Sequence, residues 1–304
     1  MRTGRHSLRP ALGLAGLLTL AFLTTAQTAA GFGVTPCPAP TVNGSGGNDT
    51  INGSSGRETI NAFGGDDIVN SLQGDDCADG GTGADIVNGG TGDDSLRGGA
   101  GADTLNGAAN SDEIFGDADN DELSGGSGND RVLGGTGFDI IEGGLGRDRI
   151  GGGAGPDDLG GGRGNDFMVG NGGFDFLSGG LGSDRMFGGS GPDDMDGGRG
   201  NDRLSGGLED DFIAGGLGSD RISGGAGPDR LEGGLGNDRI SGGSGRDAID
   251  GGLGTSRISG GSGNDRILAA NGRRDRIDCG PGRDKVVVDD HERSLRRCEI
   301  VERA

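Results

Sequence analysis

The sequence predicts an all-β solenoid built from stacked nine-residue repeats, and three observations support this fold class. Of the 304 residues, 76 are glycine, and neither Trp nor Tyr is present. Only 30% of the residues are hydrophobic, against about 45–50% in a packed domain, which excludes the single large core of an ordinary globular enzyme. Glycine recurs at positions 1, 2 and 4 of a nine-residue period, which excludes a collagen triple helix with glycine at every third residue.

The N-terminal 30 residues predict a secretory signal peptide. Three arginines lie before residue 12, an apolar run covers 12–23, and small residues follow as far as Ala30. At about a dozen residues the run is shorter than the ~20 that span a bilayer, although a single N-terminal membrane anchor is the alternative. We therefore expect an exported, extracellular mature chain without a membrane span. It would start near Gly31, with a stiff proline-rich lead-in over 31–43.

The central segment, residues 44–268, divides into 25 consecutive nonapeptides without insertion or deletion. Position 6 is Asp in 23 of the 25 units, with Glu58 and Ser256 as exceptions, and position 8 is apolar in all 25. Glycines permit positive φ and leave carbonyl groups free to face an ion, and a carboxylate is a hard oxygen donor that suits Ca²⁺. An apolar position 8 between exposed positions 7 and 9 is typical of a three-residue strand.

This consensus, G-G-x-G-x-D-x-U-x with U apolar, resembles the RTX, or haemolysin-type, calcium-binding repeat over about three quarters of the chain. Units 143–151 and 233–241 are representative. The resemblance implies a right-handed parallel β-roll in which the first six residues of each unit form a turn that holds Ca²⁺ and the next three form a short strand. The ligands it implies are glycine-turn carbonyls and the position-6 carboxylates of well-formed units, namely Asp85, Asp94, Asp103, Asp130, Asp139, Asp148, Asp157, Asp166, Asp175, Asp184, Asp193, Asp202, Asp211, Asp220, Asp229, Asp238, Asp247 and Asp265.

The charge of the array predicts that calcium takes part in folding. Residues 44–268 contain 40 Asp and Glu against 15 Arg and no Lys, a net charge of −25. Stacking brings like carboxylates to roughly one strand spacing, about 4.8 Å. We therefore expect an array that is largely unfolded without Ca²⁺ and becomes rigid at extracellular concentrations.

A longer repeat indicates two nonapeptides in each coil. Similar segments begin at Gly155, Gly191 and Gly227, 36 residues apart. This offset equals two 18-residue coils but no whole number of 27-residue coils, although recent duplication would give the same spacing. The 25 units would then form roughly twelve coils.

Two units per coil give two sheets whose exposed residues differ from residue 125 onward. One sheet presents arginines without acids: Arg131, Arg149, Arg185, Arg203, Arg221, Arg239 and Arg257. The other presents mainly acids: Glu142, Asp158, Asp194, Asp196, Glu232 and Asp250, with Arg230 and Arg266. One interpretation is that the arginines keep the roll solvated and reduce the repulsion between the nearby aspartates. The other is that they bind an anionic cell-wall or extracellular polymer, or the acidic face of a second roll. The anionic field argues against nucleic acid as a partner.

The ends of the array depart from the consensus. Glycine columns are broken in 44–79 and 107–124, where we expect weaker or empty cation sites, and at Glu209. Residues 269–304 are predicted to hold degenerate repeats, displaced by one residue, and a C-terminal cap. Four cysteines allow three disulfide pairings, of which Cys37–Cys77 with Cys279–Cys298 closes the shortest loops.

Catalysis is disfavoured because His291 is the single histidine of the expected mature chain, and H-E-x-x-H and G-x-S-x-G motifs are absent. Ice binding is disfavoured because position 3 holds Thr only at 82, 91 and 136, which cannot form a continuous row. The sequence therefore predicts a secreted, non-enzymatic calcium-binding roll with a structural or adhesive role. The alternative is an accessory or decayed fragment of a larger exported RTX toxin or enzyme system.

Overall fold

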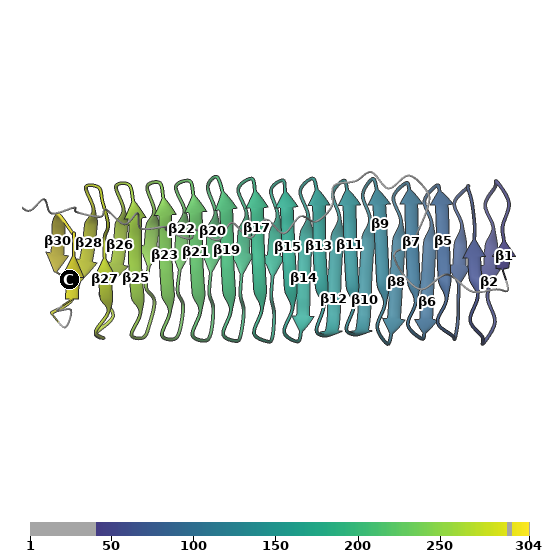
Figure 1. The fold of residues 1–304 in the computed structure, drawn as a ribbon, viewed down its shortest axis with the longest axis horizontal. Coiled ribbons are helices and arrows are strands. Elements are labelled where there is room, and N and C mark those ends of the chain that lie inside the picture. Colours follow the sequence, from purple (N-terminus) through teal and green to yellow (C-terminus); the bar gives the residue numbers. More distant parts are fainter. Residues whose placement is uncertain (1–40, 291–293, 304) are drawn as a thin grey trace, which may run out of the picture. The chain divides into compact units, whose positions relative to one another are not determined.

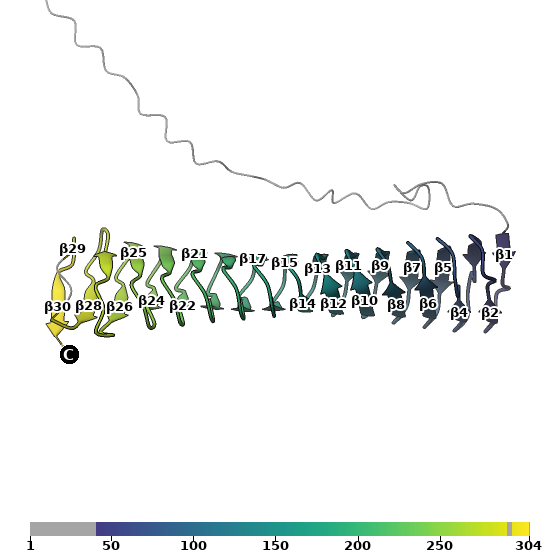
Figure 2. The same ribbon diagram turned by 90° about the horizontal axis from the view of Figure 1, so that it is seen from below.

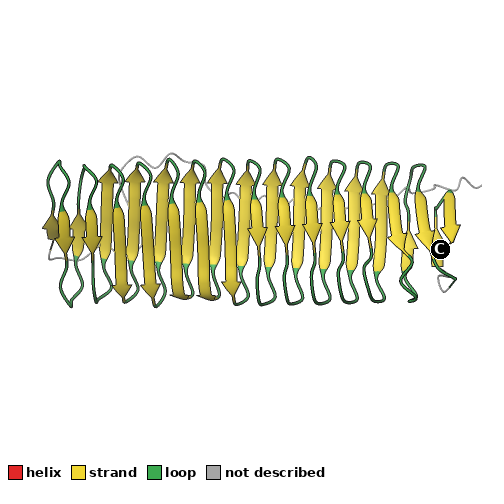
Figure 3. Ribbon diagram, turned by 180° about the vertical axis from the view of Figure 1, so that it is seen from behind, coloured by secondary structure: helices red, strands yellow, loops and turns green. Residues whose placement is uncertain are grey.

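The computed structural model describes residues 41–290 and 294–303. The predicted signal peptide, the lead-in as far as residue 40, Cys37 and His291 lie outside these residues. The described part contains strands and turns and no helix, so the all-β prediction is confirmed. It forms two sheets of 15 parallel strands each, and the chain alternates between them (Figure 1, Figure 3).

The first sheet, called sheet A, holds the odd-numbered strands. These are β1 (Thr41–Asn43), β3 (Thr59–Asn61), β5 (Cys77–Thr82), β7 (Ser95–Ala100), β9 (Glu113–Ala118), β11 (Arg131–Thr136), β13 (Arg149–Ala154), β15 (Phe167–Gly172), β17 (Arg185–Ser190), β19 (Arg203–Leu208), β21 (Arg221–Ala226), β23 (Arg239–Ser244), β25 (Arg257–Ser262), β27 (Arg276–Asp278) and β29 (Ser294–Arg296).

The second sheet, called sheet B, holds the even-numbered strands. These are β2 (Thr50–Asn52), β4 (Ile68–Asn70), β6 (Ile86–Thr91), β8 (Thr104–Ala109), β10 (Glu122–Gly128), β12 (Ile140–Gly146), β14 (Asp158–Arg163), β16 (Phe176–Ser178), β18 (Asp194–Asp196), β20 (Phe212–Ala214), β22 (Arg230–Glu232), β24 (Ala248–Asp250), β26 (Arg266–Ala269), β28 (Lys285–Val288) and β30 (Ile300–Arg303).

The strand register confirms two nonapeptides per coil. Arg203 pairs with Arg221 in sheet A, and Ile213 pairs with Leu231 in sheet B, each 18 residues along the chain. Equivalent positions of successive coils therefore lie side by side, and Figure 2 shows these coils stacked along the roll. At about 4.8 Å per strand, the 15 strands of a sheet extend over roughly 65–70 Å.

The core is a thin layer between the two sheets. Position 8 is buried in all 25 units, from Ile51 to Ile267, and Ile277 and Val286 continue the same layer. The strands show the expected alternation, with positions 7 and 9 less buried than position 8 in most coils. Most coils thus bury one apolar side chain from each sheet, and no coil has a core of its own.

Two features differ from the sequence-based expectation. Many strands have six residues rather than three, because positions 1–3 of the following unit also pair with the neighbouring coil, as Gly207 does with Gly225. Paired strands also begin before residue 44, since β1 lies within the predicted lead-in, and at the other end they continue to β30 through the segment predicted to hold degenerate repeats. The one-residue slip after Leu268 appears in the register, since Arg257 pairs with Arg276, 19 residues along. A disulfide between Cys279 and Cys298, with Cα atoms 5.2 Å apart, joins the last coils.

Candidate metal centres in the turns

The position-6 aspartates form two columns, one along each row of turns. The first aspartate column precedes sheet A and contains Asp76, Asp94, Asp112, Asp130, Asp148, Asp166, Asp184, Asp202, Asp220 and Asp238. The second aspartate column precedes sheet B and contains Asp67, Asp85, Asp103, Asp121, Asp139, Asp157, Asp175, Asp193, Asp211, Asp229, Asp247, Asp265 and Asp284. All are buried, because each side chain folds back beneath the glycine turn of its own unit.

One carboxylate oxygen of each aspartate accepts a hydrogen bond from a backbone amide. The amide of Asp130 donates to Asp148 Oδ1 at 2.8 Å, and the amide of Asp148 donates to Asp166 Oδ1 at 2.9 Å. The same link joins successive coils along both columns. The carboxylates therefore tie each coil to the one before it.

The other carboxylate oxygen has no partner. In all 23 aspartates of the two columns, Oδ2 is buried and receives no hydrogen bond within the described part of the chain. A buried, unpartnered carboxylate oxygen is strongly unfavourable, and native proteins almost always satisfy such atoms. A repeat of this defect in coil after coil indicates that a positive group belongs beside Oδ2.

The glycine at position 1 shapes the space beside Oδ2. A Cβ atom added to Gly125 would lie 2.6 Å from Asp130 Oδ2 and 2.6 Å from the carbonyl oxygen of Gly143 in the next coil. At Gly161 the corresponding distances, to Asp166 Oδ2 and the Gly179 carbonyl oxygen, are 2.8 and 2.9 Å. A carboxylate oxygen and a main-chain carbonyl oxygen of the next coil thus lie close together beside the position-1 glycine, where any side chain would collide with them, and both are oxygen donors of the kind that Ca²⁺ prefers.

Positions 2 and 4 hold the turn in a left-handed conformation. Gly126 and Gly128 have φ of 100° and 151°. Eight residues other than glycine occupy these columns and keep positive φ: Phe63, Leu72, Ala108, Asn110, Asp117, Asp119, Asn171 and Glu209. At these eight positions the turn is therefore retained although glycine is lost, at the cost of backbone strain.

Protein groups satisfy the carboxylate at the first turn of each column. The Ser45 amide and hydroxyl donate to Asp49 Oδ2 at 2.6 and 2.8 Å. In the next unit the Ser54 amide donates to Glu58 Oε2 at 2.9 Å, and its hydroxyl donates to Oε1. Serine in a glycine column thus supplies the donors that the inner turns lack.

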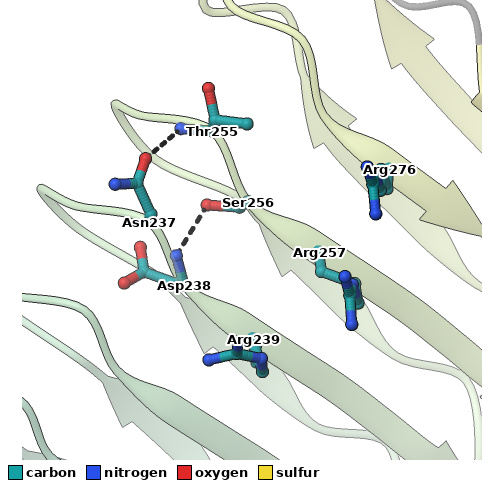
Figure 4. Close-up of a pocket in the computed structure, with 7 residues that line it drawn as sticks. All are labelled: Asn237, Asp238, Arg239, Thr255, Ser256, Arg257 and Arg276. Carbon is teal, nitrogen blue, oxygen red and sulfur yellow. Dashed lines mark hydrogen bonds between the residues drawn. The ribbon is translucent and has the colours of Figure 1, made fainter.

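Near the C-terminus an asparagine amide occupies the corresponding place. Asn271 Nδ2 donates to the carbonyl oxygens of Gly252 and Gly254, at 2.8 and 3.3 Å, and to Asp275 Oδ2 at 3.1 Å. In the preceding turn the exception Ser256 replaces a carboxylate, and its hydroxyl accepts the Asp238 amide at 3.1 Å (Figure 4). The Asn271 amide is thus surrounded by two turn carbonyl oxygens and a carboxylate oxygen. The equivalent oxygen atoms of an inner turn are the ones available to a cation.

Burial perturbs the protonation of the aspartates. Burial, with nearby acids as a smaller cause, raises the pKa of Asp94, Asp103 and Asp112 to about 7. The same causes raise the pKa of Asp202 and Asp211 to about 7. Hydrogen bonds from the backbone act in the opposite direction but are too weak to cancel burial.

The residues fit a hard divalent cation. Their donors are carboxylate and carbonyl oxygens, which Ca²⁺ prefers, and the excess of negative charge requires compensation. No three His, Cys, Asp or Glu side chains gather into a cluster among the described residues. An ion held in these turns would therefore take main-chain carbonyls together with aspartate, as the glycine columns predict.

Comparison with known families agrees with this geometry. The family model for the RTX calcium-binding nonapeptide repeat (4 copies) matches residues 43–76, 79–114, 103–132, 124–159, 160–195, 187–222, 196–231, 223–258 and 249–275. The chain belongs to the RTX calcium-binding repeat family. The predicted RTX resemblance and the parallel β-roll are therefore confirmed, and calcium binding is the property that the family implies.

Other comparisons add little to the RTX assignment. A search of curated proteins finds none that matches the chain. One solved structure with similarity is described as an X-ray crystal structure of a hyperactive, Ca²⁺-dependent, beta-helical antifreeze protein from an Antarctic bacterium. The two sequences are 18% identical, and the alignment covers 87% of this chain and 83% of the antifreeze protein chain. The TM-score of 0.34 is too low to carry an inference.

The structure places all 18 sequence-predicted ligand residues in the two columns, each with a buried, unpartnered Oδ2. It gives the same surroundings to five aspartates that sequence reasoning left out: Asp67, Asp76, Asp112, Asp121 and Asp284. Four lie in units with broken glycine columns and the fifth lies after the slip. The position-6 pattern alone would have found the first four.

Proposed function

We propose that this RTX roll is a secreted, non-enzymatic protein that folds when its turns bind extracellular calcium and then serves as a rigid structural or adhesive rod. The observation that carries the proposal is the row of 23 buried aspartate oxygens without a hydrogen-bond partner. Calcium would satisfy them and remove most of the net charge of −25 carried by residues 44–268. The ligands we assign are the 18 predicted aspartates and the five added by the structure.

Export is supported by the signal-like N-terminal segment and by the family, because RTX repeats are typical of exported proteins. The described residues contain no helix that is long and apolar enough to cross a membrane. Cleavage near Gly31 and recovery of the chain from culture medium would test export. Release of the protein from the cell envelope by a chelator would test a calcium-dependent attachment.

The calcium-dependent fold is tested by circular dichroism of the mature chain. We expect little strand signal after chelation, a cooperative gain on titration with CaCl₂, and a much weaker response to MgCl₂, which dehydrates reluctantly and requires stricter geometry. Equal strand content with and without calcium would reject the proposal.

A set of isosteric variants isolates the role of Oδ2. Asp184→Asn, Asp202→Asn and Asp220→Asn together keep an oxygen at Oδ1 for the backbone amide and replace Oδ2 by an amide nitrogen. This triple variant should bind less calcium, yet it should be more stable than the wild type in chelator because three unpaired buried charges are gone.

The matched control carries the same charge change on sheet B. Asp158→Asn, Asp196→Asn and Asp250→Asn remove three acids from outside the aspartate columns. The control should leave calcium uptake unchanged. Equal loss of calcium in the two triple variants would show that bulk charge, rather than the turn sites, controls binding.

A further inference from the structure

Sheet A carries an unbroken column of arginines on its outer surface. Register pairs join Arg185, Arg203, Arg221, Arg239, Arg257 and Arg276 on consecutive strands from β17 to β27. These six residues, called the arginine column, are all exposed. The last of them was not predicted, because the one-residue slip hides its position in the sequence.

The arginine column has no anion of its own. Within the described part of the chain no ion pair or hydrogen bond joins any of the six guanidinium groups to another residue. Arg131 differs, because Glu113 pairs with it and its guanidinium lies 5.5 Å from the centre of the Phe115 ring. Six like charges at about 4.8 Å spacing repel one another, and a row of external anions would relieve this repulsion.

The neighbouring column on the same surface adds hydroxyl groups and an aromatic ring. Position 9 holds Ser205, Ser223, Ser241 and Ser259 beside the arginines, and Phe187 lies at the start of this row, 42% exposed. Shallow hollows lie between these side chains. One is lined by Phe187, Arg203, Leu204, Ser205, Arg221, Ile222 and Ser223. Another is lined by Asn237, Asp238, Arg239, Thr255, Ser256, Arg257 and Arg276, and Figure 4 shows its arginines on adjacent strands.

We propose that the arginine column binds a linear anionic polysaccharide whose charged groups follow the axis of the roll. Arginines suit repeated sulfate, phosphate or carboxylate groups, serine hydroxyls suit sugar hydroxyls, and the Phe187 ring offers a flat apolar face for a sugar ring. A second copy fits less well. On sheet B the position-7 row continues from Asp194 to Phe212 and Arg230, and in the position-9 row Ala214 separates Asp196 from Glu232, so no continuous acidic row faces outward there.

This inference rests on the proposed function, because the first aspartate column lies directly beside the arginines. Asp184 and Asp202, for example, precede Arg185 and Arg203. Without calcium these carboxylates would repel a polyanion, and with calcium the arginine column would dominate the local field. We therefore expect binding to the polymer only in the calcium-loaded state.

The test measures binding of the calcium-loaded protein to dextran sulfate, with neutral dextran as the uncharged control and polyphosphate as an anion without sugar. Dextran sulfate should bind in a salt-sensitive manner and neutral dextran should not. Replacing Arg185, Arg203, Arg221 and Arg239 by Gln should weaken binding on the order of 100-fold, since each phosphate- or sulfate-type contact contributes to affinity. The same four changes to Glu provide a second variant with a larger expected loss.

The matched control replaces four exposed arginines elsewhere, Arg163, Arg199, Arg246 and Arg266, by Gln. It removes the same charge and should keep most of the affinity. Equal losses in both variants, or none in either, would overturn the inference. Polyphosphate binding that is as tight as dextran sulfate binding and is insensitive to Phe187→Ala would also overturn it. So would self-association that the arginine changes abolish, if no polymer binds.

Circular dichroism and calcium content are measured on every sample. An arginine variant that folds and loads calcium but does not bind the polymer supports this inference without bearing on the calcium sites. A wild-type protein that neither loads calcium nor changes its strand content would instead contradict the proposed function.

Discussion

Asn271→Ala should destabilise the C-terminal coils even when calcium is saturating. The Asn271 amide satisfies three oxygens, the carbonyls of Gly252 and Gly254 and Asp275 Oδ2. Removing one partner from a buried acceptor costs about 1–3 kcal/mol. The shortest of the three contacts is 2.8 Å and two are longer than 3.0 Å, so we expect a total loss of about 2 kcal/mol.

A second substitution separates a hydrogen-bonding cap from a cation site. Asn271→Asp replaces the donor by a second carboxylate beside Asp275, whose pKa burial already raises. In chelator this variant should be at least as unstable as Asn271→Ala because two carboxylates then face each other. In calcium it should recover, because the carbonyls and both carboxylates together form an oxygen site of the kind present in the inner turns.

Hydrogen exchange resolved by segment is the appropriate assay, because coils of a solenoid open locally and a single global transition does not apply. Amides in 251–278 should exchange faster in Asn271→Ala, by roughly 30-fold for 2 kcal/mol, while those in 130–200 stay unchanged. Asn237→Ala is the control, since Asn237 accepts one hydrogen bond, from the Thr255 amide, and is exposed. Rescue of Asn271→Ala by calcium, or failure of calcium to rescue Asn271→Asp, would refute the reasoning.

Three other changes test separate parts of the roll. Glu209 has φ of 75° and helps to raise the pKa of Asp193. Glu209→Gly should therefore stabilise the calcium-loaded roll by about 1 kcal/mol in urea titrations and tighten calcium binding. A loss of stability would contradict this. Ile222 is buried in the single apolar layer, so Ile222→Ala should cost about 2–5 kcal/mol, with faster hydrogen exchange centred on its own coil rather than spread along the roll. The pKa of Asp94 and Asp103 is raised from 3.8 to about 7, so the folded metal-free roll binds more protons than the unfolded chain. Its stability should be greatest below about pH 4 and be lost as the pH rises through 7, whereas calcium affinity should rise over the same window; circular dichroism in calcium-free buffers that shows the opposite trend would contradict the assignment.

The repeating part of the structure could be predicted because every coil obeys the same local rule. Position 8 is buried in all units because it is apolar in every nonapeptide and faces the layer between the sheets, and the 36-residue offset already indicated 18-residue coils. Aspartate at position 6 was enough to locate the candidate ligands. The weaker or empty cation sites expected in the broken glycine columns stay a prediction, although Ala108 and Asn110 adopt positive φ and keep the turn around Asp112.

What could not be predicted depends on contacts across coils at irregular places. The role of Asn271 requires the coil offset to change from 18 to 19, which places its amide over Gly252 and Gly254. The same slip brings Arg276 into the arginine column. Phe167 lies between Arg149 and Arg185 in sheet A and separates the continuous column from the earlier arginines. A column count along the sequence shows the residue types but not which ones become neighbours.

The direction of the aspartate hydrogen bonds explains why the two ends of the roll need different caps. Most position-6 amides donate to the carboxylate one coil further on, as from Asp247 to Asp265 and from Asp265 to Asp284. At the C-terminal end the last amide lacks an acceptor, and Glu299 Oε2 supplies one to Asp284 at 2.9 Å. At the N-terminal end the opposite is required, since Asp49 and Glu58 need donors, and Ser45 and Ser54 provide them. The inner turns and the turn of Asp284 keep a carboxylate oxygen that no protein group reaches within the described part of the chain. The requirement for calcium therefore extends from the middle of the roll to the last turn of the second aspartate column, while the first turns at the N-terminal end are completed by the chain itself.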